Sequence, residues 1–155
     1  MKHLVLAAGI FTIAGTASAQ DFYLGGSVDY ATPHSGDAHA SVGLMGGVAF
    51  NSGAPLSFAG QAEYSAPLAG SDNYDAARLR GLASYDFGGF AGVGGLGVTQ
   101  YRDGGTNYNG FNFSLGVDVK LQSGPATVRV EMVRDFMDDY GTDVTTTRVG
   151  YMYNF

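Results

Sequence analysis

The chain has 155 residues, of which 45% are hydrophobic and 14% charged, with 25 glycines, no cysteine and a formal net charge of −6. Without cysteine, a disulfide scaffold, a thiolate metal site and a thiol nucleophile are excluded, and without a Gly-X-Y period the glycine excess does not indicate collagen. The acidic charge and the absence of a Lys/Arg run argue against nucleic acid as a partner. The length predicts a single domain.

The first nineteen residues have the features of a secretory signal peptide. Lys2 precedes an apolar run over residues 4–14, and Ala17 and Ala19 form a small-x-small cleavage pattern. The alternative, a transmembrane helix, needs about 20 apolar residues, more than this run offers. We predict that residues 1–19 direct export through the general secretion pathway and that residues 20–155 form the mature domain.

Apolar residues alternate with small or polar residues along the predicted mature domain. Phe111 and Phe113 alternate with Asn112 and Ser114, for example. A period of two over segments of about ten residues is typical of strands in a membrane barrel. Eight such segments are predicted, at residues 21–31, 41–51, 56–66, 76–87, 90–101, 111–121, 126–136 and 144–155.

The connections between these segments alternate between short and long. Three tight turns are predicted at residues 51–55, 86–89 and 122–125, where Gly, Pro, Ser and Asp gather. Four longer connections are predicted at residues 32–40, 67–75, 102–107 and 137–143. This arrangement fits an even-stranded outer-membrane barrel with both termini in the periplasm.

The strand register can be predicted from the turns, because antiparallel partners have residue numbers with a constant sum. The turn at residues 122–125 gives a sum of 247 for the sixth and seventh segments, and a sum of 279 suits the last hairpin. The third and fourth segments allow a sum of 141 or 143. These registers pair Asp118 with Arg129, Glu131 with Arg148, and Glu63 with Arg78 or Arg80. Unlike charges meet in each case, which stabilises a cross-strand pair.

Alternation alone fits both a soluble barrel with an apolar interior and a membrane barrel with an apolar outer face. The chain ends on Phe155, with Tyr151 and Tyr153 on the same apolar face. Aromatic residues on that face favour strand ends, as two interfacial girdles require. The glycine-rich opposite face suits the narrow lumen of an eight-stranded barrel. The membrane barrel is therefore the predicted form.

The leader, the eight segments, the alternating connections and Phe155 resemble the small eight-stranded outer-membrane proteins of Gram-negative bacteria. This "porin family" group includes outer membrane protein X, the opacity-type proteins and the barrel domain of outer membrane protein A. The resemblance implies an all-β, antiparallel up-and-down transmembrane barrel in the cell outer membrane, with a structural or surface-interaction role. It also implies recognition of Tyr151, Tyr153 and Phe155 by the barrel insertion machinery. Lipopolysaccharide, outer-membrane lipid and an external ligand are the expected partners of a monomer without cofactor.

Charged residues on the predicted inner face form a candidate site. They are Asp29, Glu63, Arg78, Arg80, Asp118, Lys120, Arg129, Glu131 and Arg148. One interpretation is a structural network that fills a narrow lumen. The alternative is a narrow porin-like channel for ions or small solutes along the same residues.

Three further features of the sequence are candidate sites. His39 and Ser41 have the His-x-Ser spacing of the lipid A deacylases, but no supporting carboxylate is identifiable, so no enzyme activity is predicted. The acidic residues Asp135, Asp138, Asp139 and Asp143 are assigned to the last long loop, either as solvated carboxylates or as a weak Ca²⁺ or Mg²⁺ site. Arg134 falls on the outward face, where it either contacts a lipopolysaccharide phosphate or follows the end of its strand.

Overall fold

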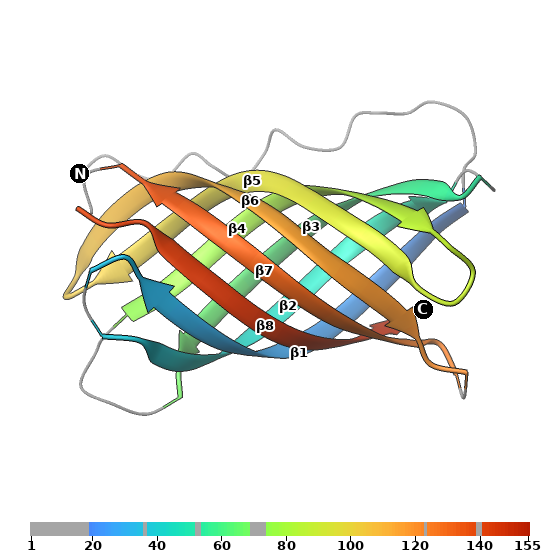
Figure 1. Ribbon diagram of the computed structural model, residues 1–155, viewed down its shortest axis with the longest axis horizontal. Coiled ribbons are helices and arrows are strands. Elements are labelled where there is room, and N and C mark those ends of the chain that lie inside the picture. The colour runs from blue at the N-terminus through green and yellow to red at the C-terminus, as the bar shows by residue number, and fades with distance from the viewer. Residues whose placement is uncertain (1–18, 36, 52–53, 69–73, 123, 139–140) are drawn as a thin grey trace.

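A computed structural model of the protein is a closed barrel of eight antiparallel strands (Figure 1). It describes residues 19–35, 37–51, 54–68, 74–122, 124–138 and 141–155. The strands are β1 (Ala19–Pro33), β2 (His39–Asn51), β3 (Leu56–Pro67), β4 (Tyr74–Asp86), β5 (Ala91–Asp103), β6 (Thr106–Lys120), β7 (Ala126–Met137) and β8 (Val144–Asn154). Each strand pairs with the next, and β8 pairs with β1. The predicted fold class is confirmed.

The predicted signal peptide lies almost wholly outside the described residues, which begin at Ala19, so its cleavage stays a prediction. No helix in the described part of the chain is long and apolar enough to cross a membrane.

The two ends of the barrel differ in their connections. The turn end carries the β2–β3, β4–β5 and β6–β7 connections and the chain terminus at Phe155. The loop end carries the other four connections. One of these, predicted as a long loop over residues 102–107, is instead a two-residue hairpin. Gly104 and Gly105 both have positive φ, 55° and 87°, which is the backbone that a type I′ hairpin turn requires and that glycine adopts without strain.

The predicted strand registers agree with the structure. Lys120 pairs with Thr127, which is the sum of 247, and Glu131 pairs with Arg148, which is the sum of 279. For β3 and β4 the sum is 141, because Glu63 pairs with Arg78. The alternative sum of 143 is wrong.

The strands are tilted because each hydrogen-bonded row climbs around the barrel. A row that starts at Phe22 on β1 returns to β1 at Thr32 after one circuit. In between it passes through Val48, Gly60, Gly81, Leu96, Phe113, Arg134 and Thr145. An offset of ten residues, from 22 to 32, over eight strands corresponds to a tilt of about 40°.

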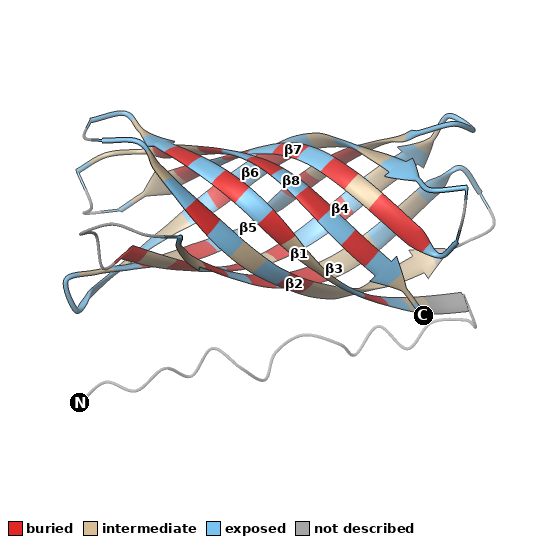
Figure 2. Cartoon of the chain, turned by 90° about the horizontal axis from the view of Figure 1, so that it is seen from below, coloured by how far each residue is buried: buried red, intermediate tan, exposed pale blue. Residues whose placement is uncertain are grey.

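The outer wall is apolar and the interior is polar, with buried and exposed residues alternating along each strand (Figure 2). Leu24, Leu44 and Leu115 on the wall are 60%, 69% and 54% exposed, whereas Arg80 and Glu131 inside are each 2% exposed. A soluble barrel has the reverse distribution, because it buries its apolar face. Aromatic rings gather near both ends of the wall. They include Tyr85, Phe87 and Phe90 at the turn end and the stacked Phe111 and Phe136 near the loop end.

Glycines on the inner face make room for long polar side chains. A methyl group at Gly47 would collide with the Tyr23 hydroxyl, and one at Gly97 would lie 2.9 Å from Cγ of Arg80. Close approach of this kind is a common reason for glycine inside a strand. The glycine excess therefore helps the narrow bore to hold tyrosine and arginine.

Candidate functional site

The interior has three parts along the barrel axis. A cavity opens at the turn end, a layer of ion pairs fills the middle, and aromatic rings close the loop end. Side chains from every strand contribute to these parts, because inward positions alternate along each one.

Glu63 on β3 is the centre of the ion-pair layer. Its carboxylate accepts hydrogen bonds from Arg78 Nη1 at 3.1 Å and from Arg148 Nη1 at 2.6 Å, and it lies 3.0 Å from Arg80 Nη2. Glu131 binds Arg80 through both oxygens, at 2.9 Å each. A carboxylate held by several guanidinium groups is compensated for the loss of water.

Two further pairs extend the layer toward the barrel ends. Arg148 Nη2 donates to Asp29 at 3.1 Å. Toward the turn end, Arg129 Nε and Nη2 donate to Asp118 at 2.6 and 2.7 Å. Gln61 joins the parts, because its amide nitrogen donates to Glu63 and its amide oxygen accepts from Arg129. The predicted inner-face residues from Asp29 to Arg148 thus lie together, with Lys120 as the exception.

Lys120 lies at the mouth of the barrel and not inside it. Its side chain is 76% exposed, and Nζ lies 3.1 Å from Asp86. β6 ends at Lys120, so the long side chain reaches solvent beyond the rim. A solvated pair of this kind adds little to stability.

Asp135 was predicted as a loop residue, and this prediction is wrong. The residue is fully buried, and it accepts hydrogen bonds from Arg78 Nε at 3.0 Å and Nη2 at 2.6 Å. Thr99 and Tyr101 also donate to it, at 2.6 and 2.5 Å. β7 continues to Met137, so Asp135 keeps the inward parity of Glu131. That parity was the signal in the sequence that could have identified Asp135 as an interior residue.

Aromatic side chains close the loop end, a feature that the sequence analysis missed. Tyr74 and Tyr101 are 7% and 0% exposed, and their ring centroids lie 4.7 Å apart. They pack with Ala31, Ala76 and Val144 in one buried cluster. This aromatic cap lies directly over the ion pairs, since Tyr101 also contacts Arg78 and Asp135.

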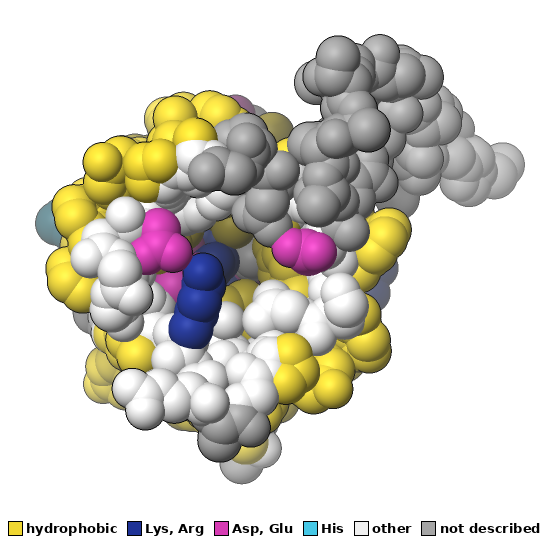
Figure 3. Space-filling model, turned by 90° about the vertical axis from the view of Figure 1, so that its right-hand side faces the viewer, with side chains coloured by type: hydrophobic (Ala, Val, Ile, Leu, Met, Phe, Trp, Pro, Cys, Tyr) yellow, Lys and Arg dark blue, Asp and Glu magenta, His cyan; other side chains and the backbone are white. Residues whose placement is uncertain are grey.

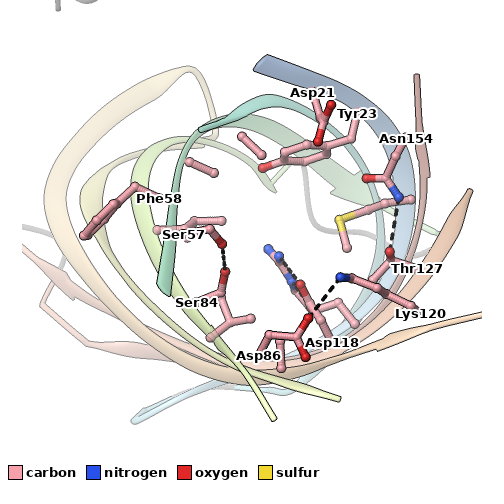
Figure 4. Close-up of a pocket in the computed structure, with 17 residues that line it drawn as sticks. Asp21, Tyr23, Ser57, Phe58, Ser84, Asp86, Asp118, Lys120, Thr127 and Asn154 are labelled. Carbon is pink, nitrogen blue, oxygen red and sulfur yellow. Dashed lines mark hydrogen bonds and ion pairs between the residues drawn. The ribbon is translucent and has the colours of Figure 1, made fainter. Parts of the chain in front are cut away.

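The turn end has an open cavity of about 300 Å³, which we call the vestibule. Figure 3 looks into it, with basic and acidic side chains across the opening. Its polar groups are paired with one another, as the close-up shows: Ser57 with Ser84, Asn154 with Thr127 and Lys120 with Asp86 (Figure 4). Its inner end is formed by Tyr23 and the Arg129–Asp118 pair. The vestibule therefore opens at the turn end and is bounded at its inner end by these side chains.

His39 and Ser41 both lie on the inner face of β2. The His39 ring packs against Tyr74 at 4.5 Å, and its Nε2 has no hydrogen-bond partner among the described residues. Ser41 is the cross-strand neighbour of Asp29 on β1, and the Asp29 carboxylate binds Arg148. No base and orienting carboxylate are seen together in the described interior, and nucleophile activation needs both.

The acidic residues of the last loop do not form a metal site in the part of the chain that the structure describes. Asp138 is exposed, Asp143 is paired with Arg134 at 3.1 Å, and Asp139 lies outside the described residues. Among described residues, no three His, Asp or Glu side chains are placed to hold a metal ion.

Arg134 lies within β7, so the alternative in which the strand ends before it is wrong. It faces outward and is the cross-strand neighbour of Phe113 on β6. Its Cζ atom lies over the Phe136 ring, 5.4 Å from the ring centroid. Tyr151, Tyr153 and Phe155 also face outward at the turn end, where they are 53%, 45% and 73% exposed.

The sequence matches no protein-family model and no curated protein. The fold, however, is similar to several solved structures. Neisserial surface protein A is 12% identical with a TM-score of 0.61, and the match covers 90% of this chain and all of that one. The attachment invasion locus protein Ail of Yersinia pestis, in complex with the heparin analogue sucrose octasulfate, is 11% identical with a TM-score of 0.62 (88% and 97% covered).

The outer membrane enzyme PagL is 14% identical with a TM-score of 0.52, and the match covers 83% of this chain and 98% of that one. The predicted resemblance to small eight-stranded outer-membrane barrels is thus confirmed for the fold. Because this fold carries both surface proteins and an enzyme, the fold itself does not decide the function.

Proposed function

We propose that the protein is an integral outer-membrane barrel of a Gram-negative bacterium, with a structural or surface-interaction role and a closed interior. The observation that carries this proposal is the inverted distribution of side chains, with leucines on the wall more than half exposed around a core of fully buried ion pairs. Such a wall is stable in hydrocarbon, where a closed barrel satisfies every backbone hydrogen bond.

In this proposal the turn end faces the periplasm and the loop end faces the exterior. Short turns and both termini are typical of the periplasmic end of such barrels. The exposed Tyr151, Tyr153 and Phe155 are then available to the insertion machinery during assembly.

The loops are the surface that an external partner would meet. Asp37 and Asp138 are exposed there, and the whole chain has a net charge of −6. Ail was solved in complex with a polysulfated sugar, but like charges repel, so the acidic chain argues against a soluble polyanion as the partner of the loops. We propose a neutral or basic external partner.

A narrow channel is the alternative function, and the vestibule is the observation that favours it. Three successive barriers oppose conduction: the Arg129–Asp118 pair, the ion pairs around Glu63, and the aromatic cap. An eight-stranded barrel has an interior just wide enough for its side chains. We therefore propose that the ion pairs are structural.

Two measurements test this function. Outer-membrane fractionation with gel mobility before and after heating is expected to find a heat-modifiable band in the outer membrane. Recording in planar lipid bilayers is expected to find little or no steady conductance. Reproducible conductance steps would favour the channel, and recovery of the protein in the soluble fraction would exclude both membrane functions.

A further inference from the structure

An apolar groove runs along the outer wall over β3 to β6. Its volume is about 560 Å³, and Phe58, Leu96 and Phe113 form its sides. The floor consists of Gly81, Ala83 and Gly94, together with the backbone of their neighbours. The groove is thus a hollow in the surface that faces hydrocarbon in the proposed membrane placement.

The glycines of the floor are not required by packing within the protein. A methyl group built on Gly81 would meet nothing closer than 4.0 Å, and one on Gly94 nothing closer than 3.8 Å. The inward Gly47 and Gly97 differ, because a methyl group there collides with a neighbour. A methyl group therefore fits at Gly81 and Gly94, and a larger side chain at either position would project into the hollow.

Arg134 lies almost straight above this groove, on the side of the loop end. It shares a hydrogen-bonded row with Phe113, Leu96 and Gly81, and that row climbs from β4 to β7. Gly94 lies two residues nearer the turn end than Leu96. With a strand tilt of about 40°, these offsets place Arg134 roughly 10 Å closer to the loop end than Gly94, with little sideways displacement.

The Arg134 side chain has the exposure and the donors to bind an anion at that height. It is 45% exposed, and Nη2 donates to Asp143 at 3.1 Å. A guanidinium has five N–H donors, so this bond leaves others for a phosphate. Outward-facing arginines in the described strands, Arg102 and Arg134, both lie at the loop end, where an anionic leaflet would complement them.

We propose that the groove and Arg134 together bind one phosphorylated lipid of the outer leaflet. One acyl chain lies over Gly81 and Gly94 and against Leu96 and Phe113, and the headgroup phosphate accepts hydrogen bonds from Arg134. The line from Arg134 to the groove has the orientation of a lipid in the outer leaflet, with the phosphate at the rim and the acyl chain pointing toward the membrane centre. Small residues let the chain approach the backbone closely, which gains dispersion contacts where no hydrophobic effect operates. The proposal rests on the proposed outer-membrane placement.

The test is native mass spectrometry of the full chain in detergent micelles, titrated separately with bisphosphorylated lipid A, dephosphorylated lipid A and phosphatidylethanolamine. The wild-type protein is expected to retain one bisphosphorylated lipid A in preference to dephosphorylated lipid A, which has no phosphate, and to phosphatidylethanolamine, whose single phosphate is balanced by its own ammonium group. Gly81→Leu with Gly94→Leu fills the groove and is expected to reduce retention of both lipid A forms about tenfold, whereas Arg134→Gln removes the preference for phosphate.

Gly46→Leu is the matched control. Gly46 is an outward glycine on β2, and a methyl group there lies 3.4 Å from the flexible end of Leu24. This variant is expected to retain lipid like the wild type. Heat-modifiable gel mobility establishes that each variant is a folded barrel, independently of lipid.

Equal retention by the groove-filled variant and the wild type would overturn the acyl site. An unchanged phosphate preference in Arg134→Gln would overturn the headgroup contact. Either result in folded barrels leaves the proposed membrane placement standing, because that placement is tested by fractionation.

Discussion

Arg78 on β4 and Asp135 on β7 are joined by two hydrogen bonds, 3.0 and 2.6 Å long, although their strands are not neighbours in the sheet. The contact crosses the bore, which is possible because eight strands enclose a lumen only as wide as its side chains. Each buried partner replaces the water that the other has lost. The pair therefore holds opposite walls of the barrel together.

Replacing Asp135 with alanine is expected to destabilise the barrel strongly. The change leaves the Arg78 guanidinium in the interior with only part of its acceptors, and breaking a buried pair in this way costs about 3–5 kcal/mol. The measurement is the free energy of unfolding in urea for protein refolded into lipid vesicles. Asp138→Ala, at an exposed position of the same loop-end region, is the control and should unfold like the wild type. Equal stability of the two variants would contradict the role given to the pair.

Replacing Gly47 with alanine is expected to displace Tyr23. The added methyl group collides with the Tyr23 hydroxyl, which donates to Gln61 at 2.8 Å. Overpacking of this kind costs about 1–3 kcal/mol, measured by the same urea titration. Gly81→Ala adds the same methyl group where it meets nothing closer than 4.0 Å, and its stability should not fall. The interpretation fails if the two alanine variants are destabilised equally.

Cysteine labelling is expected to distinguish the open end of the barrel from the closed end. The chain has no cysteine, so each introduced thiol is read without background. Ser57→Cys in the vestibule should react rapidly with a small polar thiol reagent in the folded barrel. Ala76→Cys, at a position that is 1% exposed within the aromatic cap, should stay protected until the barrel is unfolded by heat. Rapid labelling at position 76 in the folded protein would show that the cap opens.

Replacing Phe155 with alanine is expected to impair assembly in cells more than stability. The ring is 73% exposed and its backbone N–H, which the change keeps, donates to the Phe22 carbonyl at 2.8 Å. Refolding in detergent should therefore be unchanged, while the heat-modifiable band in isolated outer membranes should fall several-fold. Val149→Ala, another outward change on β8, is the control. Normal membrane levels of the Phe155 variant would argue against its role in insertion.

Much of the architecture was predictable from the period of two, because one face of each strand is polar throughout. Parity and turn positions were enough to pair Asp118 with Arg129 and Glu131 with Arg148. Contacts across the bore, such as Arg78 with Asp135, were not predictable, because register describes only neighbouring strands.

Most of the errors share one cause, which is the extent of the strands at the loop end. Residues 102–107 and Asp135 have the polar composition of loops, yet β5, β6 and β7 continue through or beside them. The burial of Tyr74 and Tyr101 was missed for the same reason. Alternation predicts an inward side chain only within a strand, and β4 and β5 extend far enough to include these two residues. Composition identifies a loop poorly where a strand extends beyond the apolar band.

Arg148 belongs to β8, the last strand to be synthesised, and its partners Asp29 and Glu63 belong to β1 and β3. An open sheet that lacked β8 would leave both carboxylates without this cation, in addition to two free strand edges. Pairing of β8 with β1 therefore also completes the ion pairs of Asp29 and Glu63. This coupling favours all-or-none closure. A barrel in which β8 and β1 are not yet paired is destabilised both by the unpaired backbone groups of those strands and by interior carboxylates that lack a cation.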